Sequence, residues 1–371
     1  MRGDEPWNID QRQLVVTHPL AGRLIRLLNQ HDRLVHRVLG AYVAQAINDG
    51  EKDNAINGAA ADVCVMAEDA ELFLNAPFNA EDKVANAGSA AFAAKAGVAA
   101  VTAADAVAAA KQAASIVALL PANNLAGPAL FDFAAPSKAL DLVKYSAADA
   151  IAALADEGST VELYAGYGKN IVTALATING SAVGILATEK AALCHKCTAK
   201  AARFVRLCDA YSIPVVTVVN TEGFGKSEGD DQAGGIRQAA RMAGVYAEAT
   251  TVKVAVLAGE AVGPAYTVFA ACADWRVAVQ GCTVAPLAPE AAVTVLYKDE
   301  IFASDNIVNA TKAKAAAYAK EVCSANAAVA NGAADTIADA ATARGAVAQA
   351  LDMLASKRTV RLAKKHGNIT L

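Results

Sequence analysis

Two apolar strands alternate with helices over residues 200–300, and this alternation restricts the chain to a sheet that is covered by helices. A helical stretch at 202–211 leads into the β-branched run at 213–219, and a second strand is expected at 252–257. Nearly continuous apolar runs of this kind are typical of strands buried on both faces. Each strand ends in a turn of small residues before the next helix. Backbone N–H groups at such helix starts can bind an anion or stabilise a developing oxyanion.

Four short motifs follow one another through this region. They read F-x-R-x-C-D-A-x-x-I-P-V from Phe204, T-x-G-F from Thr221, G-G-I-R from Gly234 and G-x-A-Y from Gly263. In this order they resemble the C-terminal half of the biotin-dependent acyl-CoA carboxyltransferases. That family includes the carboxyltransferase subunits of propionyl-CoA carboxylase and of related acyl-CoA decarboxylases such as methylmalonyl-CoA decarboxylase. The resemblance runs in register over roughly residues 62–371.

The resemblance implies a crotonase-like (ClpP/crotonase) α/β fold, a spiral of repeated ββα units with a complete C-terminal half and a truncated N-terminal half. The pattern of elements alone would also allow a doubly wound parallel sheet. Three regions are predicted. Residues 1–122 form a shortened N-terminal carboxyltransferase-like region, 123–137 a linker rich in Pro, Gly and Asn, and 138–371 the C-terminal carboxyltransferase domain.

The hairpin signal Asn179-Gly180 is the sharpest local feature, because both turn positions tolerate positive φ. It predicts paired strands at 171–178 and 182–187, after a helix at 147–156 and a strand at 161–164. Other expected elements are a helical region at 11–49, a strand at 71–74, an alanine-rich helix at 89–120 and a helical region at 310–356 with breaks at Gly332 and Gly345.

Composition narrows the class of protein. A net charge of −4 argues against nucleic acid as the main ligand. No apolar run reaches the length of a transmembrane helix, and the N-terminus carries Asp4, Glu5 and Asp10 where a signal peptide would be basic and then apolar. These features predict a cytoplasmic enzyme.

The seven cysteines are odd in number and scattered, which is typical of reduced thiols. Cys194-His195-Lys196-Cys197 has the spacing of half a zinc site, but a structural zinc normally needs four ligands and no second paired cluster exists. We therefore expect no metal and interpret this segment as a surface loop with two free thiols. His18, His31 and His36 are interpreted as solvated or structurally bonded side chains.

The resemblance implies that a carboxyl group moves between biotin, borne by a separate biotin carboxyl carrier protein, and a coenzyme A thioester. Negative charge develops on two oxygens, so two sets of backbone amides are needed and no Ser-His-Asp set is expected. The family's biotin-side sequence G-G-A-Y-D corresponds here to Gly263-Pro264-Ala265-Tyr266-Thr267. Gly263 and Ala265 are therefore the candidate catalytic residues.

Pro264 departs from the family pattern, because proline has no amide hydrogen to donate. Loss of one such donor costs on the order of 3 kcal/mol of transition-state stabilisation. A purely structural alternative is that Pro264 occupies its favoured first helical position. Thr267 replaces an acidic residue that the family links to the choice of acyl chain, so the acyl group stays open.

The candidate cofactor-binding residues lie in three loops. The resemblance implies that Gly223 and Phe224 shape the biotin pocket. Gly234 and Gly235 allow close backbone approach at a helix start, although tight helix–loop packing is an equal alternative for this pair. Asp230-Asp231, just before that pair, is interpreted as a solvated loop. The candidates are Gly223, Phe224, Gly234, Gly235, Tyr266 and Thr267.

In the family, the N-terminal half supplies most of the acyl-CoA pocket and the other oxyanion hole, through a Gly-Gly-rich turn. No such turn is found here between Asp49 and Ala61. The leading hypothesis is a carboxyltransferase or decarboxylase subunit that works as a homo-oligomer or with other subunits. The alternative is a catalytically silent paralogue that serves in assembly or in docking the biotin carrier. An ordinary crotonase-type hydratase or isomerase is a third alternative, disfavoured because no acidic pair stands at a suitable turn.

Overall fold

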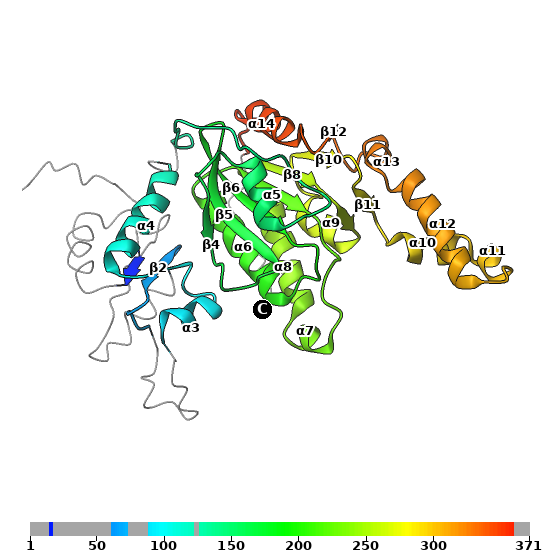
Figure 1. Ribbon diagram of the computed structural model, residues 1–371, viewed down its shortest axis with the longest axis horizontal. Helices are drawn as coiled ribbons and strands as arrows, with labels where there is room; N and C mark the ends of the chain where they lie inside the picture. The colour runs from blue at the N-terminus through cyan, green and yellow to red at the C-terminus, as the bar shows by residue number, and fades with distance from the viewer. Residues whose placement is uncertain (1–14, 18–60, 73–87, 122–125, 360–371) are drawn as a thin grey trace, which may run out of the picture.

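The computed structural model describes residues 15–17, 61–72, 88–121 and 126–359. Its centre is a seven-stranded sheet with the order β12-β10-β8-β7-β6-β5-β4 (Figure 1). The pairs β6·β7, β7·β8, β8·β10 and β10·β12 are parallel, whereas β5 pairs antiparallel with both β4 and β6. Their bounds are β4 Val161–Leu163, β5 Ile171–Ile178, β6 Ser181–Thr188, β7 Val215–Val219, β8 Lys253–Leu257, β10 Trp275–Val279 and β12 Thr336–Ala338.

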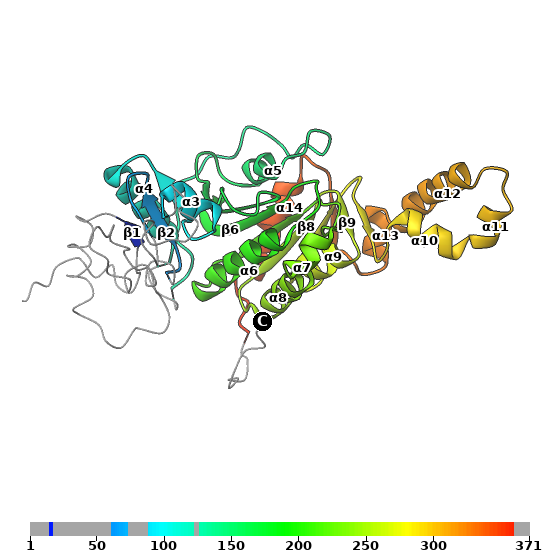
Figure 2. The same cartoon turned by 90° about the horizontal axis from the view of Figure 1, so that it is seen from below.

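Helices cover both faces of this sheet (Figure 2). Helices α5 (Ala147–Leu154) and α14 (Ala343–Leu354) pack on one face, and α6 (His195–Ala210) and α8 (Gly235–Glu248) pack on the other. Side chains of a strand point alternately to its two faces. In β7, accordingly, Val215 and Val219 join the core under α6 and α8, while Val216 and Val218 join the core under α5 and α14. Burial on both faces explains the continuous apolar runs.

The predicted hairpin is confirmed. β5 and β6 pair antiparallel from Ile171 opposite Thr188 to Ile178 opposite Ser181. The turn residues Asn179 and Gly180 have φ of 50° and 76°, the positive values that a two-residue hairpin of this type requires. The predicted helix at 147–156 and strand at 161–164 are also present as α5 and β4.

The N-terminal region contains a parallel three-stranded sheet with the order β1-β2-β3. Here the sequence-based expectations need correction. The expected helix at 11–49 is wrong at β1, and its other residues lie outside the described ones. The expected strand at 71–74 is replaced by β2 earlier in the chain, with only an isolated bridge from Glu71 to Ser89 and with residues 73–74 outside the described ones. The strands are β1 Val15–Thr17, β2 Cys64–Ala67 and β3 Val101–Ala103.

The expected single helix at 89–120 is two helices, α3 (Ala90–Lys95) and α4 (Ala106–Leu119), separated by β3. Gly97, with φ of 76°, follows α3 directly after its C-cap. Asp105 then caps α4 by accepting a hydrogen bond from the Ala108 N–H at 2.7 Å. The alanine content favours a helix throughout, but the β-branched residues of β3 gain more by pairing with β2.

Beyond β8 the chain forms a short parallel pair, β9 (Glu260–Val262) and β11 (Thr283–Ala285), with α9 (Pro264–Phe269) following β9. Helices α10, α11 and α12 then extend away from the sheet (Figures 1 and 2) before α13 returns to it. These helices are α10 Pro289–Leu296, α11 Lys298–Phe302, α12 Ile307–Val322 and α13 Ala325–Ala330.

The expected helical region at 310–356 therefore holds a missed strand, β12, between α13 and α14. Gly332, with φ of 74°, does end a helix, but Gly345 lies inside α14 and is not a break. The described part of the predicted linker, 126–137, contains no helix, and its contact with the sheet includes a bridge from Leu130 to Ser181. The three-region division of the chain stays a prediction. Within the described ranges, no helix combines the length and apolarity needed to cross a membrane.

Candidate active site

The loops that follow β7 and β8 are joined at Asn220, the first residue after β7. The Asn220 side chain is buried, and its Oδ1 accepts a hydrogen bond from the Glu260 N–H at 3.1 Å. The Thr221 N–H donates to Glu260 O at 3.0 Å. Gly259 permits this approach, because a Cβ there would lie 2.2 Å from Asn220 Oδ1. The ends of the two strands are thus fixed relative to each other.

Gly223 and Phe224 lie in the loop after β7 and contact two other elements. Gly223 adopts φ of 96°, which favours glycine, and its carbonyl accepts a hydrogen bond from the Leu193 N–H at 2.8 Å. The ring of Phe224 stacks on that of Phe269 in α9, with centroids 6.3 Å apart and an interplanar angle of 16°. The structure therefore brings the loop of Gly223 and Phe224 against α9, the helix that carries Ala265, Tyr266 and Thr267.

The turn at Gly263 has φ of 56° and ψ of −124°, and it starts α9 with Pro264 at the first helical position. The Gly263 N–H donates to Ala285 O at 2.7 Å, so this amide is already engaged in the pairing of β9 with β11. Ala265 and Tyr266 occupy the next two helical positions, whose N–H groups have no partner within a helix. Ala265 is fully buried, whereas Pro264 beside it is exposed.

The side chains of Tyr266 and Thr267 have local partners. The Tyr266 hydroxyl donates to Ala333 O at 2.9 Å, which ties α9 to the turn after α13. Thr267 is exposed, and its Oγ1 donates to Gly263 O at 3.3 Å. These bonds hold the turn in shape. Nothing in them assigns either side chain to a ligand, so their binding roles stay predictions.

Gly234 and Gly235 begin α8, which packs against α9. Gly234 has φ of 81°, and a Cβ on Gly235 would lie 3.0 Å from Asp230 O. Close packing thus accounts for the need for glycine at Gly235, and a role toward cofactor stays a prediction. Asp230 and Asp231, expected in a solvated loop, lie instead in α7 (Glu228–Gln232), where the Ser227 Oγ accepts a hydrogen bond from the Asp230 N–H at 3.1 Å.

The segment from Cys194 to Cys197 is not the predicted surface loop but the start of α6. Cys194 is the N-cap residue and Cys197 is fully buried in the first turn. Cysteine has only moderate helix propensity, so the pair does not itself signal a helix, and the helix start is decided by the burial of Cys197 against Gly168. Across the residues that the structure describes, no cluster of three or more His, Cys, Asp or Glu side chains is placed to hold a metal.

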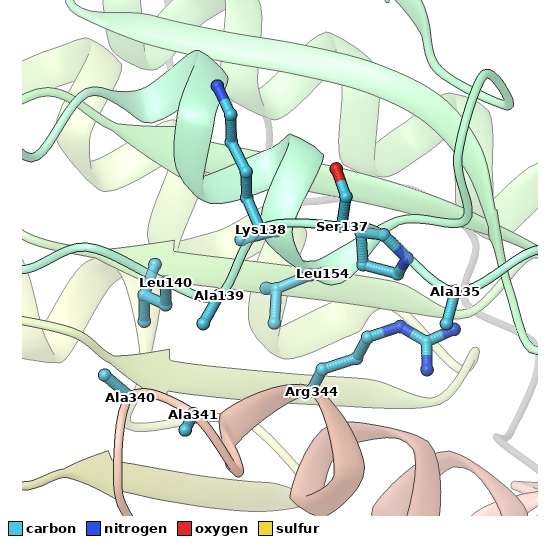
Figure 3. A pocket seen from close by; sticks show the side chains of 11 residues that line it. Ala135, Ser137, Lys138, Ala139, Leu140, Leu154, Ala340, Ala341 and Arg344 are labelled. Atoms are coloured by element: carbon cyan, nitrogen blue, oxygen red, sulfur yellow. The ribbon is translucent and has the colours of Figure 1, made fainter.

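A pocket of about 250 Å³ lies beside α5 and α14 (Figure 3), the helices that cover the face of the sheet opposite α6 and α8. It is lined by the segment 135–140, by α5 and by the start of α14, including Arg344. None of the predicted site residues lines it. The Arg344 guanidinium is held by Asp156, with Arg344 Nη2 2.6 Å from Asp156 Oδ1.

Sequence reasoning missed the residues that join the loops of the candidate site. Asn220 is recognisable only as a buried polar residue once its strand is known, and Leu193 carries no sequence signal. Both the N–H and the carbonyl of Leu193 bind the Phe224 loop, the N–H through Gly223 O and the carbonyl through the Gly225 N–H, each at 2.8 Å. Such backbone contacts are specified by the fold and not by residue type.

The sheet, with a hairpin feeding parallel strands separated by helices, has the crotonase-like fold. The chain is similar to the crystal structure of transcarboxylase 12S, a hexamer and multienzyme core with methylmalonyl-CoA and methylmalonic acid bound, with a TM-score of 0.79 and 30% identity over 86% of this chain and 66% of that one. It also shares the fold of a single-chain, multi-domain long-chain acyl-CoA carboxylase, with a TM-score of 0.65 and 22% identity over 80% of this chain and 32% of that one. The expected fold class is thereby confirmed.

A family model described as the carboxyl transferase domain matches residues 59–369. The chain therefore belongs to the carboxyl transferase domain family, and the resemblance inferred from its motifs is confirmed.

Among curated proteins, the chain is 37% identical to the methylmalonyl-CoA carboxyltransferase 12S subunit of Propionibacterium freudenreichii subsp. shermanii, over 60% of this chain and 44% of that one. It is 33% identical to the methylmalonyl-CoA decarboxylase subunit alpha of Propionigenium modestum, over 61% of this chain and 45% of that one. It is 32% identical to the mitochondrial propionyl-CoA carboxylase beta chain of Homo sapiens, over 61% and 42%. The chain spans less than half the length of these relatives.

Proposed function

We propose that this chain is the carboxyltransferase component of a biotin-dependent carboxylase or decarboxylase. It moves a carboxyl group between biotin on a carrier protein and an acyl-CoA of the propionyl or methylmalonyl type. Support comes from the family and from relatives whose names specify methylmalonyl-CoA carboxyltransferase, methylmalonyl-CoA decarboxylase and propionyl-CoA carboxylase.

The observation that carries the proposal is the junction of the Phe224 loop with the turn at Gly263. The stacking of Phe224 on Phe269 and the hydrogen bonds at Asn220 place the two motif-bearing loops side by side. These loops come from the ends of the adjacent parallel strands β7 and β8, and open α/β sheets bind ligands at the carboxyl ends of such strands.

The turn from Gly263 to Ala265 retains only part of the set of backbone donors expected on the biotin side of the site. The Gly263 N–H is bound to Ala285 O and Pro264 has no N–H, so Ala265 is the residue of the Gly263-Pro264-Ala265 segment whose amide can still donate. Biotin on its carrier would bring the carboxyl group, and an amide donor at Ala265 would stabilise the negative oxygen that develops there. Because Ala265 is buried, we propose that its amide is approached from the exposed side of the turn, where Pro264 and Thr267 lie. The glycines 223, 234 and 235 would let the backbone approach closely.

The proposed partners are a biotin carboxyl carrier protein, further copies of this chain and other subunits of a carboxylase or decarboxylase, within the cytoplasm. The transcarboxylase 12S structure is a hexamer, and the family resemblance implies active sites that lie between subunits. A second copy or a separate chain would then complete the acyl-CoA side.

The test is a transfer assay with the full chain, a biotinylated carrier protein or free biotin, and malonyl-, methylmalonyl- and glutaconyl-CoA. Biotin-dependent loss or transfer of the carboxyl group from one of these thioesters is the expected result. No turnover together with tight binding of the carrier would instead support the silent docking subunit, which Pro264 and the engaged Gly263 amide favour.

A further inference from the structure

Two thiols meet at the N-terminus of α6. The Sγ atoms of Cys194 and Cys197 are 3.1 Å apart, with Cys194 at the N-cap and Cys197 in the first turn. A disulfide has an S–S distance of about 2.05 Å. The two sulfur atoms therefore need to approach by only about 1 Å to bond.

The two thiols differ in accessibility. Cys197 is fully buried, while Cys194 is partly exposed and can meet a small molecule from solvent. Burial raises the pKa of the Cys197 thiol above its usual value. This asymmetry assigns an order, because attack on an external disulfide requires an accessible sulfur. Cys194 reacts first and Cys197 second.

The backbone around the pair holds the thiols in place. The Cys197 N–H donates to Cys194 O at 2.9 Å, and a Cβ on Gly168 would lie only 3.0 Å from Cys197 Cα. One helical turn later, the buried Lys200 Nζ donates to Tyr167 O at 3.1 Å and to Ile171 O at 2.7 Å. Both bonds fasten α6 to the turn that contains Gly168. The sulfur atoms are thus kept facing each other without a covalent bond.

A metal does not account for this arrangement. His195 lies between the two cysteines in sequence, but its Nδ1 faces Asp230 Oδ1 at 3.4 Å. In the described part of the chain no third or fourth ligand joins the cysteines in a group suited to a metal, and a structural zinc needs four. Cys194 and Cys197 are both free cysteines.

We propose that Cys194 and Cys197 are a redox-active dithiol that forms a reversible disulfide by exchange with a small-molecule disulfide such as glutathione disulfide. The Cys194 thiolate attacks one sulfur of the external disulfide, forms a mixed disulfide and expels one thiolate. The Cys197 thiol then loses its proton, attacks Cys194 Sγ and expels the second thiolate. Two protein thiols are oxidised, and one external disulfide is reduced to two thiols.

The dithiol lies next to the loop that carries Gly223 and Phe224, so disulfide formation would take place beside that loop. Cys194 adjoins Leu193, whose backbone holds Gly223 and Gly225 of the Phe224 loop. The proposal does not depend on the function proposed above, because it rests only on the geometry of α6.

The experiment exposes the full, folded chain to glutathione disulfide, blocks remaining thiols with an alkylating agent and maps the peptides by mass spectrometry. We expect an intramolecular Cys194–Cys197 disulfide that dithiothreitol reverses. In Cys197→Ser the reaction should stop at a glutathione adduct on Cys194, and in Cys194→Ser the thiol of Cys197 should stay unmodified.

Cys272 provides the matched control, because it is an exposed thiol in the described part of the chain. Cys272→Ser should leave formation of the Cys194–Cys197 bond unchanged. The proposal is overturned if the wild-type chain accumulates glutathione on Cys194 without closing the bond. It is equally overturned if Cys272 reacts while both Cys194 and Cys197 stay reduced, or if the pair reacts only after a chelator has removed a metal.

Discussion

At the scale of single residues, the turn at Gly263 shows how one side chain can remove a hydrogen-bond donor. Pro264 stands at the first helical position of α9, where proline fits well. Pro264 itself has no N–H and the Gly263 N–H is bound to Ala285 O, so within the Gly263-Pro264-Ala265 segment the Ala265 amide can still donate. Proline at this position therefore favours the start of the helix, but it removes an N–H that the proposed chemistry would use.

Replacing Pro264 by Gly should restore an amide donor beside Ala265. If the turn stabilises negative charge, turnover should rise by up to about a hundredfold, the effect of one oxyanion-hole donor of roughly 3 kcal/mol. The measurement is the rate of biotin-dependent carboxyl transfer by folded protein. Pro289→Gly is the control, because Pro289 occupies the same position in α10. An unchanged rate in well-folded Pro264→Gly would place the donors elsewhere.

Asp156 is a buried carboxylate that organises the hairpin turn. Its Oδ1 accepts hydrogen bonds from Asn179 N–H at 3.0 Å and from Arg344 Nη2 at 2.6 Å. Its Oδ2 accepts hydrogen bonds from Gly180 N–H and from Thr177 Oγ1, both at 2.7 Å. The carboxylate thus joins the β5–β6 turn to α14.

We expect Asp156→Asn to lower the free energy of unfolding by about 3 kcal/mol, since it leaves the Arg344 guanidinium without its charged partner. Denaturant unfolding measures the loss. Asp132→Asn, at an exposed position in the same part of the chain, is the control and should change stability little. Equal stability of the Asp156 variant and wild type would contradict the role of this hub.

The same residue should make stability depend on pH. Burial acts to raise the pKa of Asp156, but the hydrogen bonds from Gly180, Thr177, Arg344 and Asn179 outweigh it and hold the pKa below its usual value. The ionised form is favoured by folding, so its contribution is present above the unfolded pKa of about 3.9 and is lost as the pH falls through the folded pKa. The stability difference between wild type and Asp156→Asn should be constant from about pH 5 to 7 and shrink below about pH 4. A difference that grows in acid would refute this sign.

At the scale of elements, glycines at different places in α8 should behave oppositely. Gly244 is exposed in the helix interior, where an added Cβ would meet no atom within 4 Å, whereas Gly234 adopts φ of 81° at the N-cap. Gly244→Ala should raise the free energy of unfolding by about 0.5–1 kcal/mol, because glycine is a poor helix former. Gly234→Ala should lower it, because alanine is strained at positive φ. Thermal unfolding of both variants tests the contrast, and a stabilised Gly234 variant would argue against the left-handed cap.

At the scale of the whole molecule, the sheet and the α10–α12 extension differ in how much apolar surface they bury. The sheet lies between two large cores, whereas the cluster formed by α10, α11 and α12 comprises Val293, Ile301 and Ala315 with Tyr297 and Tyr318 against them. Several large apolar side chains on these helices are exposed, among them Val295, Leu296, Phe302 and Val308. A small core of this kind provides little free energy against local opening.

Amide hydrogen exchange of the isolated chain should therefore be fastest in α10–α12 and slowest in β7 and β8. The physical reason is that local opening of α10–α12 exposes few buried contacts, while exchange in the central strands requires opening of the whole sheet. If the carrier protein, another subunit or a further copy of the chain covers the exposed apolar side chains of α10–α12, adding it should slow exchange in these helices. Uniform protection across the isolated chain would contradict this division.

The sequence by itself determined the hairpin and two of the buried strands of the central sheet. Asn179-Gly180 specified the hairpin, and the apolar runs around Val216 and Val254 specified the buried strands, because these signals are local and strong. Four motifs in register also identified the family. Local signals failed where tertiary pairing overrode propensity, as at Val101–Ala103, where an alanine-rich stretch gains more from pairing with β2 than from remaining helical.

Only the tertiary structure decided how the predicted site residues are held. It showed that the Gly263 N–H is bound to Ala285 O, that Phe224 stacks on Phe269, and that Cys194 and Cys197 face each other at the start of α6. The physical reason is that each of these depends on atoms brought together by the packing of elements. Residue types reveal which chemistry is available, but hydrogen bonds already made, burial and distance decide which groups are free to perform it.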